Sequence, residues 1–382
     1  MFPVTLSTIL AVILAFIVSF AVSWFSIPRI SKLCKRINLT DKTTDHQIHN
    51  NGTPSLGGVA IFLGFTFGFL LTVNNNMPGV TPFMVGVLIL FFTGIKDDLV
   101  SVFPWYKILV QIVSGLIICF FTTIRITNLH GFLGISEISV LVSFIITLLL
   151  FVVIVNSFNL IDGIDGLASS VGIIVSTTYG IWFWISHDYG YAVMSASLSG
   201  ALLIFLPYNL SNRKNKILMG DTGSLMIGFI LTVMTIRFNE INVSSNSMHS
   251  LHSSPSVSIA ILIVPLFDAM RVVLIRLVRK TSIFNADNRH IHHMMLRAGF
   301  SHFQSTLLIS VVNLIIILIG FLFDGLGIIW MVLMLLLISV FFTTLIYIKV
   351  ARIEKWNWER GIINTILKND KPKIADVINL PK

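Results

Sequence analysis

One short stretch of the chain sets several polar side chains directly after a long apolar run. Residues 140–155 carry no charged side chain, and they are followed by Asn156-Ser157-Phe158-Asn159-Leu160-Ile161-Asp162-Gly163-Ile164-Asp165-Gly166-Leu167. Amides and carboxylates in or beside a bilayer are costly unless they are paired or bind a cation. Asn, Asp and Gly also form ordinary turns between helices, but a turn needs only one or two such residues. Two amides and two carboxylates with glycines between them therefore indicate a functional site.

The composition is that of a membrane protein. Of the 382 residues, 55% are hydrophobic and only 11% are charged, with a mean hydropathy of +0.90, whereas soluble domains carry about 25% charged residues. The first apolar segment is too long for a signal peptide and no basic residue precedes it, so we expect it to span the membrane. In such a protein the net charge of +9 reports topology and not nucleic-acid binding. Cys34 and Cys119 are far apart and predict no disulfide framework.

We expect an all-α polytopic membrane protein with about ten or eleven transmembrane helices. Apolar segments long enough to cross a bilayer occur near residues 5–27, 55–73, 80–95, 107–123, 138–156, 167–186, 191–208, 222–236, 257–278, 305–323 and 326–348. They are expected to form a single transmembrane catalytic domain over residues 1–350, followed by a cytoplasmic tail over residues 351–382. No internal repeat is visible, so the usual pointer to an inverted-repeat transporter is missing.

The basic residues set the expected orientation. If the first helix ends in the cytoplasm, all but two of the 26 Lys and Arg residues fall in cytoplasmic segments. The two exceptions are Arg125 and Arg237. Because Lys and Arg accumulate on the cytoplasmic side, this asymmetry predicts a multi-pass protein of the cell (inner) membrane with its N-terminus outside and its C-terminus inside.

The unusual polar residues also gather on the predicted cytoplasmic side. They lie in residues 41–58, 94–107, 156–167, 209–224 and 281–302. A cation-coupled transporter would instead place ionisable residues near the middle of the bilayer. Only Asp268 lies well inside an apolar run, and Arg271, one turn later, could pair with it. The pattern favours an enzyme that joins a cytosolic compound to a membrane-dissolved one, and transport is the alternative.

Two of these segments contain candidate ligands for phosphate or metal. Asp97 and Asp98 are adjacent at a helix end and should repel each other unless a cation is close. Lys107 follows; alone it could simply reach to the interface, but beside paired aspartates it is a candidate phosphate clamp. In Gly220-Asp221-Thr222-Gly223-Ser224, Asp221 stands where an apolar helix begins. It could cap that helix or hold a metal that bridges phosphates.

A histidine-rich segment follows the last of these groups. It reads Asp287-Asn288-Arg289-His290-Ile291-His292-His293. Zinc is disfavoured because no cysteine or glutamate nearby completes a tetrahedral set, and the histidines beside Arg289 suit an oxyanion or diphosphate better. An intramembrane metal hydrolase is also disfavoured, since the chain has no His-Glu-x-x-His pattern.

Four motifs together resemble the polyprenyl-phosphate N-acetylhexosamine-1-phosphate transferases, the WecA-type branch of a superfamily that includes the MraY translocases. The similarity runs from about Asp41 to Gln304. It rests on Asp97-Asp98, Asn156-x-x-Asn159-x-x-Asp162-Gly-Ile-Asp165-Gly-Leu, Gly220-Asp221-Thr222-Gly223-Ser224, and His290-Ile-His292-His293 followed by Arg297-Ala-Gly-Phe300. The His-Ile-His-His form resembles the WecA-type branch in particular.

The resemblance implies a helical fold around a cytoplasmic cleft and a reaction between a UDP-N-acetylhexosamine and undecaprenyl (polyprenyl) phosphate in the membrane lipid. UMP is released and a lipid-diphosphate sugar forms, which initiates a surface glycan such as O-antigen. The cofactor is expected to be Mg²⁺, with Mn²⁺ as an alternative. The default donor is UDP-GlcNAc, and a GalNAc or 6-deoxy relative is the alternative. A homodimer is left open.

The same resemblance implies roles for individual residues. Asn159 and Asp221 would hold the metal, while Asp165 and Gly163 would lie at the uracil. Asp162 is placed with the substrate-binding residues, or shapes the loop. The remaining expected contacts are Lys107 with the phosphates, Asp97 and Asp98 with the lipid phosphate, and His290, His292 and Arg289 with the diphosphate or sugar.

Two departures from the family pattern affect these assignments. The family's first cytoplasmic loop resembles Asp-Lys-Pro-x-x-Arg-Lys-x-His, and its Arg-Lys pair is here His46-Gln47, although Asp41, Lys42 and His49 match. We therefore expect His49 to bind substrate but leave the sugar open. The family's arginine before the histidines usually falls one position earlier, where this chain has Asn288.

Overall fold

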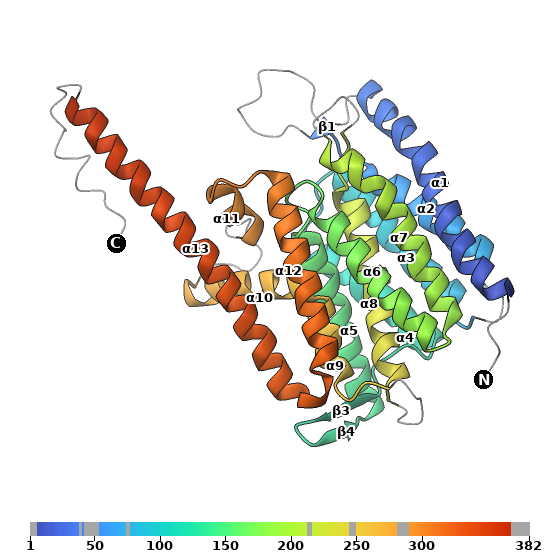
Figure 1. The fold of residues 1–382 in the computed structure, drawn as a ribbon. Coiled ribbons are helices and arrows are strands. Elements are labelled where there is room, and N and C mark those ends of the chain that lie inside the picture. Colours follow the sequence, from blue (N-terminus) through green and yellow to red (C-terminus); the bar gives the residue numbers. More distant parts are fainter. Residues whose placement is uncertain are drawn as a thin grey trace.

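The computed structural model describes residues 6–37, 40–41, 53–73, 77–211, 216–243, 250–280 and 290–367. Within them the chain is a bundle of helices with two small antiparallel strand pairs, β1–β2 and β3–β4 (Figure 1). In chain order the elements are α1 (Leu6–Arg36), β1 (Thr40–Asp41), β2 (Thr53–Pro54), α2 (Gly57–Thr72), α3 (Val80–Leu99), α4 (Pro104–Phe121), β3 (Asn128–Phe132), β4 (Ile135–Glu137), α5 (Val140–Leu160), α6 (Leu167–Ile185), α7 (Tyr189–Leu210), α8 (Gly220–Ile241), α9 (Ser254–Ile261), α10 (Ile263–Val278), α11 (Ile291–Arg297), α12 (His302–Leu322), η1 (Asp324–Leu326) and α13 (Ile328–Leu367).

The predicted all-α polytopic membrane fold is confirmed. Among the described residues, nine helices are long and apolar enough to cross a membrane, and a tenth span results if α9 and α10 count as one. The shorter apolar helix α2 accounts for the eleventh predicted segment. α13 continues through residue 350 to Leu367 without a break, so the predicted start of a separate tail at residue 351 stays a prediction.

Residues 257–278, expected to span the membrane, form two helices and not one. α9 and α10 meet at a bend of 82°, with Leu262 between them. Pro265 explains the position of the break, because a proline removes a backbone donor and its ring clashes with the carbonyl four residues earlier. That earlier residue is Ile261, the last residue of α9.

Helix α8 lies in the middle of the bundle and is the helix that the others surround. It packs against α2, α3, α5, α6 and α9, and nearly all of its side chains from Thr222 to Ile236 are buried. Two of its threonine hydroxyls donate within the helix, Thr232 to the Gly228 carbonyl and Thr235 to the Leu231 carbonyl, each at 2.7 Å. α8 therefore holds its two ends in fixed positions at opposite faces of the bundle.

The two ends of the bundle differ in character. Figure 1 shows α11 and the start of α12 at one end, and the β3–β4 hairpin at the other. α3 and α5 end at the first of these faces and α8 begins there, so the described parts of the polar segments 94–107, 156–167 and 209–224 meet at one end of the bundle. α13 leans away from the bundle over its later part, as a long ribbon at the left of the figure.

Helices α1 and α2 approach closely through small residues. A Cβ added to Gly64 would lie 1.9 Å from the Ser23 Oγ and 2.7 Å from the Ser19 carbonyl oxygen, and one added to Gly68 would lie 2.7 Å from the Ala15 carbonyl oxygen. Where lipid surrounds a protein, such close backbone contact and its van der Waals packing hold helices together. The sequence Gly64-x-x-x-Gly68 thus fixes α2 against α1.

We predict that Gly64→Ala destabilises the protein by about 1–3 kcal/mol, since the added methyl group overpacks this contact. Thermal unfolding of the purified protein in detergent should show a lowered midpoint. Gly325→Ala is the matched control because nothing lies within 4 Å of a Cβ at that position. Equal midpoints for the two variants would contradict the proposed packing role.

Candidate active site

A cavity of about 1040 Å³ lies where α3 and α5 end and where α6, α8 and α12 begin. Its walls contain six of the residues singled out in the sequence: Asp98, Asn159, Asp162, Gly163, Asp165 and Asp221. They come from three motifs that are far apart along the chain. The cavity is therefore the candidate active site, called the cleft below.

Asp98, near the end of α3, caps the beginning of α8. Its Oδ1 accepts a hydrogen bond from the Asp221 N–H (2.8 Å), and its Oδ2 accepts from the Thr222 N–H (3.0 Å) and hydroxyl (2.5 Å). The first N–H groups of a helix have no acceptor within the helix, and a negative charge is favourable beside them. The cap thus comes from another helix, and the alternative that Asp221 caps α8 is wrong.

Glycines allow this close approach of helix ends. Gly220 has a φ of +71°, and a Cβ at this position would lie 2.6 Å from the Asp98 Oδ2 and 2.3 Å from the Ser55 carbonyl oxygen. On the other side of α8, a Cβ on Gly58 would lie 2.1 Å from the Gly223 nitrogen. Larger residues at these positions would push Asp98 and the start of α8 apart.

Lys107, near the start of α4, connects two carboxylates. Its Nζ lies 2.6 Å from the Asp221 Oδ2 and also pairs with the Asp97 Oδ2. Asp97 is held on its other oxygen by the Val102 N–H at 2.6 Å. The adjacent aspartates therefore diverge, Asp97 towards the lysine and Asp98 towards α8, and the cation expected beside them is Lys107.

Asn159 and Asp221 face each other, as a shared metal site requires. The Asn159 amide nitrogen donates to the Asp221 Oδ1 and to the Ser224 hydroxyl, the latter at 2.8 Å. A half-turn of the amide would place its oxygen beside Asp221, and an amide oxygen with a carboxylate oxygen suits Mg²⁺. Among the described residues no three His, Cys, Asp or Glu side chains converge as a metal cage. Mg²⁺ usually keeps waters and binds substrate phosphates besides one or two protein oxygens, so this pair fits it.

Asp162 lies in the loop between α5 and α6 and lines the cleft. Removal of its carboxyl group from water raises its pKa well above the ordinary value, and the negative charges of Asp221 and Asp98 raise the pKa further. A hydrogen bond from the Gly220 backbone acts in the opposite direction. Burial and the neighbouring carboxylates thus both disfavour the charged form of Asp162.

Asp165 also lines the cleft, and Lys216 and His302 hold its side chain. The Lys216 Nζ lies 2.6 Å from the Asp165 Oδ2, and the His302 Nδ1 lies 3.3 Å from the same oxygen. The backbone carbonyl of Asp165 also accepts a hydrogen bond from the Thr306 hydroxyl at 2.9 Å. Lys216 and His302 were missed as site residues. In the sequence Lys216 was only one more basic residue of a cytoplasmic segment, and His302 was only the last residue of the polar segment 281–302.

Of the histidines, His290 contacts Asp268, the acidic residue that lies well inside an apolar run. Its Nδ1 lies 2.9 Å from the Asp268 Oδ2, while the other oxygen of Asp268 accepts from the Ile291 N–H at 2.8 Å. Arg271 also pairs with Asp268 at 3.2 Å, as the spacing of these two residues suggested. Asp268 thus anchors the segment that opens α11, which leaves the transporter alternative without a free carboxylate at this position.

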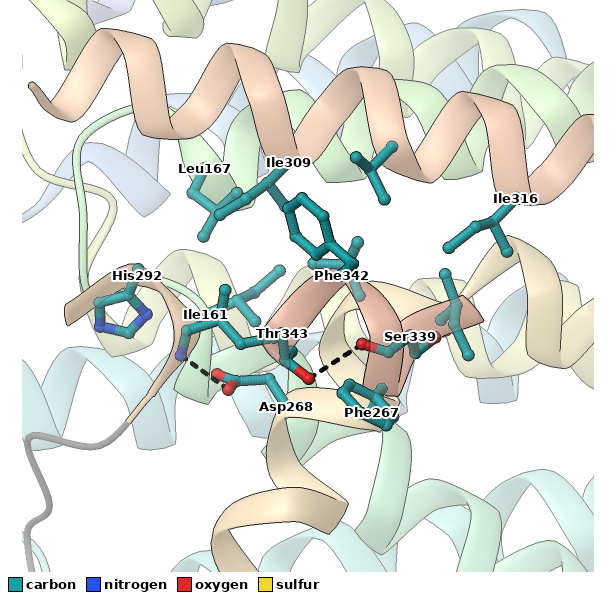
Figure 2. Close-up of a pocket in the computed structure, with 14 residues that line it drawn as sticks. Ile161, Leu167, Phe267, Asp268, His292, Ile309, Ile316, Ser339, Phe342 and Thr343 are labelled. Carbon is teal, nitrogen blue, oxygen red and sulfur yellow. Dashed lines mark hydrogen bonds between the residues drawn. The ribbon is translucent and has the colours of Figure 1, made fainter. Parts of the chain in front are cut away.

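His292 lies behind the floor of the cleft. A Cβ on Gly163 would lie 2.2 Å from its Nε2, so only a glycine fits there. Figure 2 shows His292 at one edge of a small apolar cavity of about 30 Å³ between α10, α12 and α13. Burial, followed by the charges of His293 and His290, lowers the pKa of His292 to about 3. His292 is therefore a neutral imidazole at physiological pH, with neither nitrogen bonded to another described residue.

Two predicted substrate-binding residues, His49 and Arg289, lie outside the described residues, as do His46, Gln47 and Asn288. The roles assigned to them stay predictions. The contacts expected between the other site residues and substrate also stay predictions.

The sequence of the chain matches those of known proteins. Residues 80–239 match the model of glycosyl transferase family 4. The chain is 30% identical over 332 residues to a probable undecaprenyl-phosphate N-acetylglucosaminyl 1-phosphate transferase of Bacillus subtilis strain 168, covering 84% of this chain and 86% of that protein. It is 29% identical over 318 residues to the undecaprenyl-phosphate alpha-N-acetylglucosaminyl 1-phosphate transferase of Escherichia coli strain K12, covering 81% of this chain and 84% of that protein.

The chain is therefore a multi-pass membrane protein of the glycosyltransferase class. It belongs to glycosyl transferase family 4, and the resemblance seen in the four motifs is confirmed. The family match includes all of α3 and α8 as far as Asn239, and hence Asp98 together with the helix start that it caps.

We predict that Asp98→Asn lowers the stability of the protein by about 1–3 kcal/mol, because the new amide would point a donor at donors of Thr222 or Asp221. Glu354→Gln makes the same chemical change in an exposed pair with Arg297, where about 0–1 kcal/mol is expected. Thermal unfolding of both variants in detergent measures the difference. Two equally small shifts would refute the capping role of Asp98.

Proposed function

We propose that this protein transfers GlcNAc-1-phosphate from UDP-GlcNAc to undecaprenyl phosphate in the cell membrane and releases UMP. The observation that carries the proposal is the arrangement of Lys107, Asp97, Asp221 and Asn159 at one end of a membrane-spanning bundle. The relatives from Escherichia coli and Bacillus subtilis are named undecaprenyl-phosphate N-acetylglucosaminyl 1-phosphate transferases, after the same transfer. The orientation predicted from the basic residues places this end of the bundle in the cytoplasm.

The position of the cleft suits two substrates of different solubility. A nucleotide sugar is water-soluble and would enter from the open end of the bundle. The acceptor phosphate is attached to a lipid, so it can reach the same end only from the membrane surface. A cleft at the ends of α3, α5 and α8 is where both reacting groups can meet.

The reaction has to bring two anions together. The lipid phosphate oxygen forms a bond with the β-phosphorus of the donor, and the bond from that phosphorus to the oxygen bridging it to the α-phosphate breaks. The electron pair leaves with UMP. At close range two such charges repel by several kcal/mol at an effective dielectric of about 20. We favour this direct displacement over an aspartyl-phosphate intermediate.

Lys107 is placed to reduce this repulsion. Its Nζ now pairs with Asp97 and Asp221, and an arriving phosphate would compete for the same ammonium group. Asp97, once released from Lys107, could accept the remaining proton of a lipid phosphate whose second pKa is about 6. Asp98 is engaged in capping α8 and would act by positioning Asp221.

Asn159 and Asp221 would hold Mg²⁺, or Mn²⁺ in its place. A bound divalent cation would supply charge neutralisation for the diphosphate and the departing UMP. Ser224 now accepts from the Asn159 amide, and the Asp98 carboxylate accepts from the Asp221 N–H. Asp98 would keep its bond, while the Asn159 amide would turn its oxygen to the cation and Lys107 would turn towards the phosphates.

The donor nucleotide would lie towards Asp165. The carboxylate is held in place by Lys216 and His302 and lines the same cleft as Asp221, so a base at Asp165 and phosphates at Asp221 would share one cavity. A side chain at position 163 would collide with His292, so the wall of the cleft beside Asp165 carries only the Gly163 backbone there. A GalNAc or 6-deoxy donor remains the alternative, since the first cytoplasmic loop departs from the family pattern.

We predict that the purified protein releases UMP only when UDP-GlcNAc, undecaprenyl phosphate and Mg²⁺ are all present. Removal of divalent cations with EDTA should abolish turnover, and added Mg²⁺ should restore it. Asp221→Asn should lower kcat by at least about a thousandfold, because charge stabilisation of the transition state is the main contribution expected here. Glu354→Gln serves as a folded control with normal turnover. Near-normal UMP release by Asp221→Asn would overturn the metal assignment. UMP release measured with a panel of UDP-sugars identifies the donor.

We further predict that Lys216→Gln raises the KM for the UDP-sugar about tenfold while kcat changes by less than threefold. Loss of the ion pair would free the Asp165 carboxylate from its orientation without touching the phosphates, so that ground-state binding suffers most. Initial-rate kinetics at saturating lipid phosphate test this. A fall in kcat with unchanged KM would place Lys216 at the reacting phosphates instead of at the nucleoside.

A further inference from the structure

A second polar cavity lies at the end of the bundle opposite the cleft. It has a volume of about 500 Å³ and is lined by Cys119, Thr122, Thr123, Arg125, Thr127, Arg237 and Glu240. Arg237 is on α8, the helix that carries Asp221 at its other end. The rise of an α-helix separates these two residues by about 24 Å along the axis, so the second cavity lies at the other face of the membrane.

The two arginines of this cavity are the two basic residues that topology does not explain. All other Lys and Arg residues fall in segments predicted to be cytoplasmic, and basic residues are disfavoured on the external side. Arg125 and Arg237 are far apart in the sequence, yet both line one cavity. Their convergence indicates a common task.

Arg125 has an aromatic neighbour but no hydrogen-bonding partner in the described part of the chain. Its guanidinium carbon lies 5.7 Å from the centroid of the Phe144 ring. No hydrogen bond or ion pair joins the group to another described residue. Its N–H donors are therefore available to a planar or tetrahedral oxyanion.

Arg237 is arranged in a similar way. Its guanidinium group lies over the ring of Tyr191 at 5.4 Å, and its Nε donates to the Asp188 Oδ2 at 2.7 Å. This one bond fixes the plane of the group, while its two terminal nitrogens make no other hydrogen bond within the described residues. Both arginines are thus oriented before any ligand arrives.

Glu240 does not neutralise the arginines by direct contact. Its Oε1 accepts from the Thr127 N–H at 2.8 Å, and its Oε2 accepts from the Thr127 hydroxyl at 2.7 Å. These two bonds tie the segment after α4 to the end of α8. Glu240 therefore holds Arg125 and Arg237 on the same cavity, and both of its oxygens already have a donor.

We propose that this external cavity, between Arg125 and Arg237, binds a phosphate group. Arginine pairs with phosphate through two parallel hydrogen bonds, which are stronger than neutral ones, and the threonine hydroxyls of the lining suit the remaining oxygens. The phosphate belongs either to a lipid headgroup at that membrane surface or to a soluble phosphate compound. The site is separate from the transferase reaction and does not depend on it.

The experiment measures the thermal unfolding midpoint of the purified protein in detergent, since a ligand that binds the native state raises it. One arm titrates inorganic phosphate at constant ionic strength with chloride. The other arm adds phosphatidic acid to the micelles, with diacylglycerol as the matched lipid without phosphate. Arg125→Gln removes the unpaired guanidinium group, and Arg237→Lys keeps the charge but loses the paired donors.

Arg29→Gln is the matched control, because Arg29 lies over the Phe25 ring at 5.8 Å and is part of neither cavity. Any phosphate bound in the cleft raises the midpoint of all variants alike. We expect Arg125→Gln and Arg237→Lys to weaken the apparent affinity about tenfold relative to wild type and Arg29→Gln, with UMP release unchanged. A response to inorganic phosphate supports a soluble ligand, and a response to phosphatidic acid alone supports a headgroup. If Arg125→Gln responds like wild type in both arms, the proposal is overturned.

Discussion

The hydrogen bonds from the start of α8 to the Asp98 carboxylate are the contact on which the cleft depends. The first N–H groups of α8 have no acceptor within the helix, and a carboxylate from α3 accepts from those of Asp221 and Thr222. The same bonds set the direction of Asp221, which follows directly in that turn. The need of the first N–H groups of α8 for an acceptor therefore also positions the side chain of Asp221.

Charge inside this cleft is balanced over several residues and not pair by pair. Lys107 serves two carboxylates at once, burial and acidic neighbours raise the pKa of Asp162, and Asn159 is a neutral partner of Asp221. A divalent cation and a diphosphate would each bring the charge that the other needs.

Sequence reasoning found the spans and the one-sided polar segments because both follow from local composition. It also selected Asp221 and Asn159, through the family motifs. It could not show that Asp98 caps α8, because that contact joins residues far apart in the chain, and a cap was sought within the same helix. Lys216 was missed for a similar reason: in the sequence it is one basic residue among many, and only the fold brings it to Asp165. The bend between α9 and α10 was missed because hydropathy does not register a proline inside an apolar run.

The motif at the end of α5 shows how the bilayer shapes such a site. Asn156 bonds to Gln111, Asn159 to Asp221 and Asp165 to Lys216, while Gly163 lies on His292. Each of these polar side chains has a partner on a different segment of the chain. The dense polar pattern that first suggested one shared function is thus a junction where α4, α8, α11 and the segment before α8 meet. A site assembled in this way needs glycines between its polar residues, since every partner approaches the backbone from a different direction.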